Sequence, residues 1–317
     1  MKKLGLFAYG ETGLSALKGL VNYFEVLWII TPPKGLETQD SSSVEEMAKD
    51  KGIKIVRTNS NSEIYDLISK DIPAAVVIST YNKILSEKIL KLTKFINIHH
   101  GALPRWRGRA NINWAIILGR DEIGLTFHKA SIDLDSGDIY AQFMVPITKD
   151  DNVKTVYDKF NNLIEMNLSD IVKKVIEGIK GKKQEMKGTY CCTRLPEDGL
   201  IDWKNGTIQI DRLVRALTKP YPGAFTYFEG KKLIIWESEI PKNPNIYEGR
   251  IPGRVVAIHR ERGVEILTGD SSIIIKNVEY DGKETNASEV INSVKKTLGI
   301  NIVQLYEAVQ KLLEKQK

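Results

Sequence analysis

An amide, an imidazole and a carboxylate occur close together in the chain, within residues 97–104 and 135–138. Such groups can together catalyse acyl transfer, since an amide stabilises an oxyanion and an imidazole moves protons near neutral pH. Three of the four histidines fall between residues 99 and 128. Asn97 and His99 are two residues apart, so on an extended strand their side chains share one face. We therefore identify Asn97, His99 and Asp135 as candidate catalytic residues.

A strand and the turn that follows it must position these groups. Phe95 and Ile96 are typical of a buried strand, and Pro104 directs the chain out of it, because proline restricts its own φ and its predecessor. Polar groups at the carboxyl end of a strand in an open α/β sheet commonly bind ligands. A hydrogen-bonded structural histidine and an ordinary Asp-Gly turn are the alternatives at these positions.

Short apolar runs alternate with amphipathic stretches over the first half of the chain. This alternation predicts an α/β fold, a Rossmann-like, doubly wound, mostly parallel sheet with right-handed crossovers. The expected strands are residues 4–8, 26–30, 54–56, 74–79, 95–98, 125–130 and 138–145. Helices are expected at 15–23, around 64–69, at 153–178 and from Ser43, which forms a capping-box pattern with Glu46.

Beyond Thr193 the pattern changes to many short strands, at residues 223–228, 232–237, 253–259, 263–268 and 272–278. Such strands predict a smaller, OB-like β-barrel. Residues 287–315 are typical of helix, interrupted near Gly299, and residues 180–187 are typical of a charged linker. We expect a catalytic domain at 1–190, an OB-like domain at 191–285 and a helical tail at 286–317.

The composition is that of an ordinary globular protein, with 317 residues, 42% hydrophobic and 27% charged. The sequence has no apolar run near the ~20 residues of a membrane span, and Met1 is not followed by a signal-peptide pattern, so we expect a cytoplasmic location. Cys191 and Cys192 are adjacent and predict neither a disulfide framework nor a metal site. The net charge of +6 suits phosphate-bearing ligands without requiring nucleic acid.

A glycine pattern after the first strand, Ala8-x-Gly10-x-x-Gly13, invites comparison with dinucleotide-binding turns. That fingerprint needs glycine where Ala8 stands and an acidic residue at the end of the second strand, where this chain has Thr31-Pro32. We therefore expect a tight strand-to-helix turn and no NAD site.

The chain resembles the formyltransferases that use 10-formyltetrahydrofolate, and the resemblance spans most of its length. It is carried by Asn97-x-His99 with its following loop, by Asp135-x-Gly137 and by the first strand and turn. Residues 107–114 are similar to a stretch of the sugar-nucleotide formyltransferases, such as the formyltransferase half of the bifunctional enzyme for UDP-4-amino-4-deoxy-L-arabinose. Segments that look like the family's C-terminal domain are residues 202–203, 220–227 and 232–236.

The resemblance implies a role for each group of residues. Asn97 would stabilise the oxyanion, His99 would carry the proton, and Asp135 would orient His99 and favour its imidazolium form. Folate contacts are implied for Lys83, Ile84, Leu85, Arg109, Ser131, Ile132, Asp133 and Leu134. Substrate contacts are expected from Arg107, Asn113, Trp114 and Tyr221. With a nucleotide diphosphate substrate, Arg107 and Arg109 are natural phosphate partners, because arginine binds phosphate in a bidentate manner. Core packing for Ile84 and Leu85, solvated loop charges for the two arginines and interface packing for Tyr221 are the alternatives.

The sequence also departs from the family pattern. Gly101-Ala102 stands where the family has Ser-Leu, and Asn111 replaces a common proline. His100 occupies a variable position, and His128 is expected to be structural. None of these changes removes a candidate catalytic group.

The acceptor amine is predicted from residues 31–44, where methionyl-tRNA formyltransferases carry a longer, basic loop. Here the loop is short and sets Lys34 against Glu37 and Asp40, so it would not neutralise phosphates. We therefore predict a UDP- or dTDP-linked amino sugar as the acceptor, in the biosynthesis of a surface glycan. The alternatives are a methionyl-tRNA formyltransferase and a non-catalytic nucleotide- or nucleic-acid-binding protein. A homodimer is compatible with the sequence, which does not fix the oligomeric state.

Overall fold

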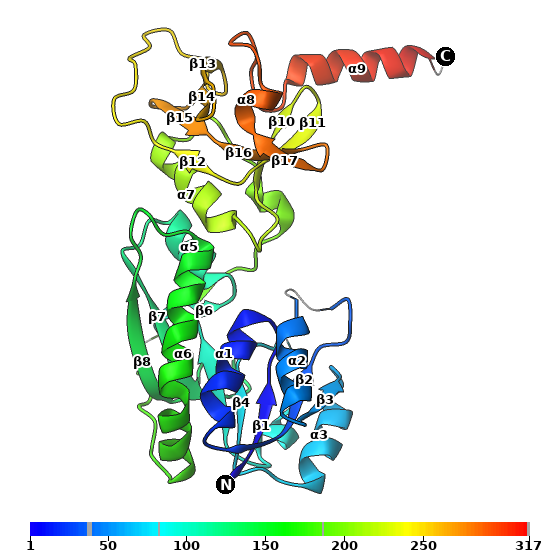
Figure 1. Cartoon of the computed structure of the whole chain (residues 1–317), viewed down its shortest axis with the longest axis vertical. Coiled ribbons are helices and arrows are strands. Elements are labelled where there is room, and N and C mark those ends of the chain that lie inside the picture. The colour runs from blue at the N-terminus through cyan, green and yellow to red at the C-terminus, as the bar shows by residue number, and fades with distance from the viewer. Residues whose placement is uncertain (37–39, 82, 186, 316–317) are drawn as a thin grey trace. The chain divides into compact units, whose positions relative to one another are not determined.

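The structure is a computed structural model, which describes residues 1–36, 40–81, 83–185 and 187–315 (Figure 1). The chain divides into two compact units. The first comprises Met1–Ala115, Arg120–Asp151 and Thr155–Thr193, and the second comprises Ile116–Gly119, Asn152–Lys154 and the described residues from Arg194 onward. The three-part division at 1–190, 191–285 and 286–317 stays a proposal.

A seven-stranded sheet of order β3-β2-β1-β4-β5-β7-β8 forms the centre of the first unit. Its parallel part consists of β1 (Lys3–Phe7), β2 (Glu25–Thr31), β3 (Lys54–Arg57), β4 (Ala75–Ile78) and β5 (Phe95–His99). Two antiparallel strands, β7 (Glu122–Lys129) and β8 (Ile139–Pro146), extend it beyond β5. The predicted Rossmann-like, mostly parallel sheet is confirmed.

Helices connect these strands, as expected from the alternating sequence pattern (Figure 1). They are α1 (Gly10–Val21), α2 (Ser42–Asp50), α3 (Asn61–Lys70), α4 (Glu87–Leu90) and α5 (Asn111–Ile117). A further helix, α6 (Val153–Ile176), follows β8. A short parallel pair, β6 (Arg107–Gly108) and β9 (Tyr190–Cys191), lies outside the main sheet. The segment after α6 therefore joins the loop that follows β5.

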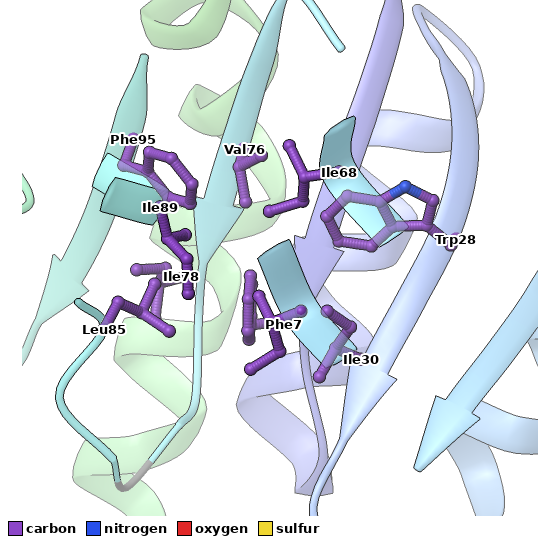
Figure 2. Close-up of a cluster of buried hydrophobic side chains, with 10 residues drawn as sticks. Phe7, Trp28, Ile30, Ile68, Val76, Ile78, Leu85, Ile89 and Phe95 are labelled. Carbon is purple, nitrogen blue, oxygen red and sulfur yellow. The ribbon is translucent and has the colours of Figure 1, made fainter. Parts of the chain in front are cut away.

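One face of the sheet packs its apolar side chains against α3 and α4, as Figure 2 shows. Phe7, Trp28 and Val76 from the strands contact Ile68 of α3 and Ile89 of α4 in a single buried cluster. Burying a large apolar side chain stabilises a fold by about 1.5–3 kcal/mol, so this cluster fixes the strands against the helices. The candidate site depends on that rigidity, because it sits at the end of β5.

Helix α1 packs closely against α6, and Gly19 makes the approach possible. A Cβ on Gly19 would lie 2.9 Å from the carbonyl oxygen of Glu165, which is closer than real Cβ contacts. Figure 1 shows the two helices side by side in front of the sheet. The sheet is thus covered by helices on both faces, as a buried parallel sheet requires.

The second unit is rich in β-strands, and its strands form two four-stranded antiparallel sheets. The first sheet contains β10 (Ala224–Phe228), β11 (Lys231–Ile235), β16 (Asn277–Tyr280) and β17 (Lys283–Asn286). The second contains β12 (Ser238–Glu239), β15 (Ser272–Ile275), β14 (Gly263–Leu267) and β13 (Val255–His259). Its helices are η1 (Pro196–Gly199), α7 (Thr207–Leu217), α8 (Ala287–Val290) and α9 (Ile302–Lys315). The predicted β-rich unit and short C-terminal helices are confirmed.

Two boundary predictions in the first sheet and helices need correction. The helix expected from Ser43 begins at Ser42, because the Asp40 carboxylate accepts a hydrogen bond from the Ser42 backbone nitrogen (3.1 Å) and starts the helix earlier. The capping box with Glu46 is therefore wrong. The helix expected from Ser15 already begins at Gly10, whose φ of 66° makes the tight turn after β1.

Two more predictions fail in the second unit. The strand expected over 272–278 is two strands in different sheets, because the backbone nitrogen of Lys276 donates to the Glu237 carbonyl oxygen (2.9 Å) and breaks the run. The interruption expected near Gly299 extends over residues 291–301 between α8 and α9.

Candidate active site

The candidate site is built on the end of β5, where Asn97 and His99 lie beside the antiparallel strand β7. In that pairing Asn97 is opposite His128, and His99 is opposite Thr126. Asp135 reaches the same place from the loop between β7 and β8. The three candidate catalytic residues are therefore brought together by two neighbouring strands and one loop.

The protonation of His99 follows from its contacts. Its Nε2 lies 2.6 Å from the carbonyl oxygen of Trp106 and 3.1 Å from Asn111 Nδ2. Because a carbonyl can only accept and this contact is the shorter one, we assign the proton to Nε2. Asn111 donates to the same oxygen from Nδ2 (2.8 Å). Nδ1 of His99 then faces Asp135 Oδ2 at 3.6 Å. The basic nitrogen of His99 is thus the one nearest the carboxylate.

His128 orients the amide of Asn97. Nδ1 of His128 lies 2.9 Å from the Lys129 carbonyl oxygen and therefore carries the proton, which leaves Nε2 to accept from Asn97 Nδ2 (2.9 Å). Burial, reinforced by the charge of His99, lowers the pKa of His128 below its usual 6.5. His128 is therefore neutral at neutral pH and remains an acceptor. An amide nitrogen has two N–H groups, so Asn97 keeps one for a substrate oxygen.

The side chain of Asp135 is fixed by a hydrogen bond and lies near both histidines. Its Oδ2 accepts a hydrogen bond from the backbone nitrogen of Gly108 (2.9 Å), and its Oδ1 lies 3.7 Å from Nε2 of His128. The side chain is 10% exposed. Its carboxylate therefore sits between two histidines with little solvent around it.

Unusual backbone conformations gather around these residues. Trp106, Ala110 and Asp135 have φ angles of 65°, 56° and 49°, a region that residues other than glycine rarely occupy. Such strain costs about 1–3 kcal/mol per residue and tends to occur at functional sites. The surrounding hydrogen bonds must hold these loops in place.

The turn after His99 is packed too tightly for a side chain at Gly101. A Cβ there would collide with the Trp106 carbonyl oxygen and come within 2.6 Å of His99 Nε2. Thr126 Oγ1 donates to the Gly101 carbonyl oxygen (2.6 Å), and Gln142 Nε2 donates to both Thr126 Oγ1 (2.8 Å) and the Leu103 carbonyl oxygen (2.9 Å). Glycine in place of the family's serine therefore suits the position that His99 occupies.

The residues expected to contact folate lie in two loops. After β4, Leu85 belongs to the buried core, Ile84 is 66% exposed, and Lys83 Nζ donates to the Asn59 carbonyl oxygen (3.2 Å). After β7, Ile132 and Leu134 are 52% and 48% exposed. Ser131 Oγ donates to the Asp133 carbonyl oxygen (2.9 Å), and Arg109 is exposed on the loop after β5.

The residues expected to contact the acceptor are dispersed. Arg107 donates from Nη2 to Gln184 Oε1 (2.7 Å), and its guanidinium lies near the Tyr190 ring. Asn113 and Trp114 lie on α5, where Asn113 is 1% exposed and Trp114 Nε1 donates to the Cys192 carbonyl oxygen (3.0 Å). Tyr221 belongs to the second unit, in the turn between α7 and β10.

Two residues of the site were missed or undervalued from sequence. His128 is a buried, hydrogen-bonded residue, as expected, but its bond to Asn97 is not predicted; its position opposite Asn97 in the β5–β7 pair is a signal that exists only after pairing. Gln184 lay in the segment expected to be a linker, yet it bonds to the Asp135 carbonyl oxygen (2.9 Å). No local sequence pattern marks it.

No three or more His, Cys, Asp or Glu side chains in residues 1–36, 40–81, 83–185 and 187–315 are grouped to hold a metal ion. Within that described part of the chain, no helix is both long and apolar enough to cross a membrane.

Comparison with known proteins identifies two matching families. The family described as "Formyl transferase" matches residues 21–172, and "Formyl transferase, C-terminal domain" matches residues 195–295. The chain is 35% identical to methionyl-tRNA formyltransferase of Caldanaerobacter subterraneus subsp. tengcongensis, over 86% of this chain and 90% of that protein. It is 32% identical to the bifunctional polymyxin resistance protein ArnA of Wigglesworthia glossinidia brevipalpis, over 92% of this chain and 47% of that one.

Among solved structures, HypX from Aquifex aeolicus in complex with tetrahydrofolic acid has a similar fold. The TM-score is 0.66 at 19% identity, and the match covers 92% of this chain and 47% of HypX. The chain thus spans about half the length of ArnA and of HypX.

Proposed function

The chain belongs to the formyl transferase family, and from this premise we propose that it transfers a formyl group from 10-formyltetrahydrofolate to the amine of a nucleotide-linked amino sugar. The observation that carries the proposal is the convergence of Asn97, His99 and Asp135 at the end of β5. A protein that only binds ligands has no need for this arrangement.

Asn97 is proposed to stabilise the transition state. Attack of an amine on a formyl carbon develops negative charge on the former carbonyl oxygen, and a fixed N–H donor stabilises that charge. Since His128 holds one N–H of the Asn97 amide, the other has a defined direction. The amide is therefore oriented before substrate binds, which is the condition for effective electrostatic stabilisation.

His99 and Asp135 are proposed to handle the proton. The attacking amine must lose a proton, and Nδ1 of His99 is the basic atom because Nε2 already donates to the Trp106 carbonyl oxygen. The Asp135 carboxylate, 3.6 Å from Nδ1, stabilises the imidazolium that forms. The same proton can then pass to the leaving nitrogen of the folate.

Folate binding is supported by the exposed apolar side chains of two loops. Ile84, Ile132 and Leu134 are each about half exposed or more, and a flat pterin ring would cover apolar surface of this kind. The similar fold of HypX is described with tetrahydrofolic acid bound, which supports the same class of ligand here.

The nucleotide-sugar acceptor is supported by the segment between β2 and α2. Lys34 is its single basic residue, and Asp40 bonds to Ser42 at its far end. Glu37 lies outside the described residues, but it adds a further negative charge to the sequence. Arg109, exposed beside the site, is the arginine that we assign to the diphosphate, since arginine binds phosphate in a bidentate manner.

A methionyl-tRNA acceptor is the second candidate, and one observation favours it. The methionyl-tRNA formyltransferase relative is 35% identical and matches along 90% of its own length.

The test is formyl transfer from 10-formyltetrahydrofolate to a panel of UDP- and dTDP-linked amino sugars, run beside methionyl initiator tRNA. Tetrahydrofolate release and product mass would be followed in each reaction. Turnover with a sugar and none with tRNA is the expected result. Turnover with tRNA alone would show that the acceptor is methionyl-tRNA and not an amino sugar. No turnover with any acceptor would contradict the proposed function.

A further inference from the structure

The segment after α6 lies against both loops of the candidate site. Lys182 and Ile139 exchange two backbone hydrogen bonds (2.8 Å each), which places the segment beside the start of β8. Gly181 permits the contact, because a Cβ there would lie 2.7 Å from Cβ of Asp138. Further along, the carbonyl oxygen of Thr189 accepts from the Arg107 backbone nitrogen (2.8 Å). The segment therefore spans from the Asp135 loop to the loop after β5.

Gln184 lies at the centre of this segment and bonds to the Asp135 loop. Its Nε2 donates to the carbonyl oxygens of Asp135 (2.9 Å) and Gly137 (2.7 Å). Both N–H groups of the amide are thus used on the two sides of one turn. These bonds hold a residue whose φ of 49° is otherwise unfavourable.

Arg107 fixes the orientation of the Gln184 amide. Its Nη2 donates to Gln184 Oε1 (2.7 Å), and its Nη1 donates to the hydroxyl of Tyr190 (3.3 Å). A flipped amide would set an oxygen against two carbonyl oxygens and an NH₂ against the guanidinium, so only one orientation is compatible with the contacts. Gly188 leaves room for the arginine, since a Cβ there would lie 2.7 Å from Arg107 Nε.

Asp135 is thereby held at two points. Gln184 holds its backbone carbonyl, and the backbone nitrogen of Gly108, next to Arg107, holds its carboxylate. Because Arg107 and Gly108 are adjacent, the same short strand β6 supports both ends of the arrangement. Loss of the Gln184 bonds would release the backbone while the carboxylate kept a single donor.

We propose that Gln184, anchored by Arg107, is a positioning residue that fixes Asp135 against His99 for formyl transfer. The expected effect on catalysis rests on the proposed function. The expected effect on the position of Asp135 rests on the hydrogen bonds alone. Arg107 is thereby assigned to this internal role in place of a substrate contact. The segment that looked like a linker is then part of the active site.

The experiment uses Gln184→Leu, which keeps the size of the side chain and removes every hydrogen bond. Hydrogen exchange of the Gly108 amide would be followed in ¹⁵N-glycine-labelled protein, because that amide is protected by the Asp135 carboxylate. We expect its exchange to accelerate severalfold, less than the about tenfold expected for complete loss of a bond to a charged group, because the Gly108 bond is weakened and not removed. Asp135→Ala gives the upper limit of this effect.

Steady-state kinetics then test the catalytic part. In Gln184→Leu we expect kcat to fall by about 10–100-fold, since a displacement near 1 Å can cost that much, with KM for 10-formyltetrahydrofolate within about twofold of wild type. Lys183→Leu and Glu185→Gln, at exposed neighbouring positions, should match wild type in both measurements. Gln184→Glu, which keeps the acceptor for Arg107 and loses both donors, should behave as Gln184→Leu does.

The outcomes separate the two proposals. Unchanged Gly108 exchange, or unchanged kcat, in variants that fold like wild type would overturn the positioning role. If Gln184→Leu fails to fold, Gln184→Glu and Arg107→Met make the same test from the other groups of the arrangement. Wild-type protein inactive with every acceptor would contradict the proposed function, while the exchange measurement, which needs no substrate, would still decide the role of Gln184.

Discussion

At the scale of single residues, hydrogen bonds to backbone carbonyl oxygens decide which ring nitrogen of His99 and of His128 carries the proton. The Trp106 carbonyl oxygen sets the proton of His99 on Nε2, and the Lys129 carbonyl oxygen sets that of His128 on Nδ1. The remaining ring nitrogens then face Asp135 and Asn97. Each side chain proposed to do chemistry is therefore oriented by a neighbour that does none.

Asn97→Ala tests the oxyanion role. Loss of one fixed donor typically costs about 10²–10³ in turnover, so kcat should fall by that order while folate binding stays close to wild type. Steady-state kinetics and calorimetric titration with a non-reactive folate measure the two quantities. Binding that weakens in proportion to turnover would instead assign Asn97 to ligand positioning.

His128→Phe tests whether His128 acts through Asn97. The ring shape is kept while the acceptor for Asn97 Nδ2 is lost, so kcat should fall by about tenfold or more, because the donor is no longer aimed. The double variant with Asn97→Ala should be no slower than Asn97→Ala alone, since residues that act as a unit are not additive. Additive losses would show that His128 acts independently of Asn97.

At the scale of elements, β6 depends on a glycine. Gly108 has a φ of 94°, and a Cβ on it would lie 2.5 Å from the Cys191 carbonyl oxygen, so Gly108→Ala must displace β6 from β9. A left-handed backbone conformation alone costs about 1–2 kcal/mol, and we expect the free energy of unfolding to fall by more than this. We also expect a lower kcat, because the bond from the Gly108 backbone nitrogen to Asp135 moves.

Gly52→Ala is the matched control for that prediction. Gly52 has a φ of 66°, but a Cβ there would meet nothing within 4 Å, so only the backbone cost applies. Urea unfolding and kinetics of both variants provide the comparison. Equal destabilisation with full activity in both would contradict a supporting role for β6.

The end of β5 also makes the fold sensitive to acid through His100. Its ring stacks on Phe160, and Nε2 is buried without a hydrogen-bond partner among the described residues. Burial, with a contribution from the charge of His99, lowers the pKa of His100 from 6.5 to about 3. Between these two pH values His100 binds a proton in the unfolded chain but not in the folded protein. The stability that depends on neutral His100 is therefore fully present above pH 6.5 and is lost as the pH falls.

His100→Phe should remove this dependence. At pH 5 the wild type loses about 2 kcal/mol through His100 relative to pH 7, at ~1.4 kcal/mol per pH unit, and the variant should not. His128 shifts in the same direction, so part of the acid sensitivity stays in the variant. The free energy of unfolding from urea titrations at pH 7 and pH 5 tests this. Parallel pH dependence in both proteins would show that His100 accepts its proton in the folded state.

At the scale of the whole molecule, charge bears on the choice of acceptor. The net charge is +6, and the segment before α2 has one lysine against two acidic residues. If the acceptor carries only a diphosphate, a plot of log kcat/KM against log salt concentration should have a slope of roughly 0 to −2. A tRNA acceptor would give a steeper slope, because more phosphates are neutralised. Initial rates at several KCl concentrations measure the slope, with the folate at saturation. A steep slope for the sugar would mean that further charged groups take part.

The class of fold and the three groups proposed for chemistry can be predicted from residue types and their spacing alone. Alternating apolar runs specify strands and helices locally, because side-chain period follows from backbone geometry, and the α/β unit and the β-rich unit were both predicted in order. Asn97, His99 and Asp135 were identified because amide, imidazole and carboxylate are recognisable from residue type and from their resemblance to known motifs.

The residues that orient those groups are brought to them by contacts between distant parts of the chain. His128 meets Asn97 through antiparallel pairing of β5 with β7, and Gln184 meets Asp135 across 49 positions of sequence. The split of residues 272–278 between two sheets likewise depends on Glu237, far away in the chain. Such contacts leave no local pattern, because a hydrogen bond depends on position in space and any amide or imidazole brought there could form it.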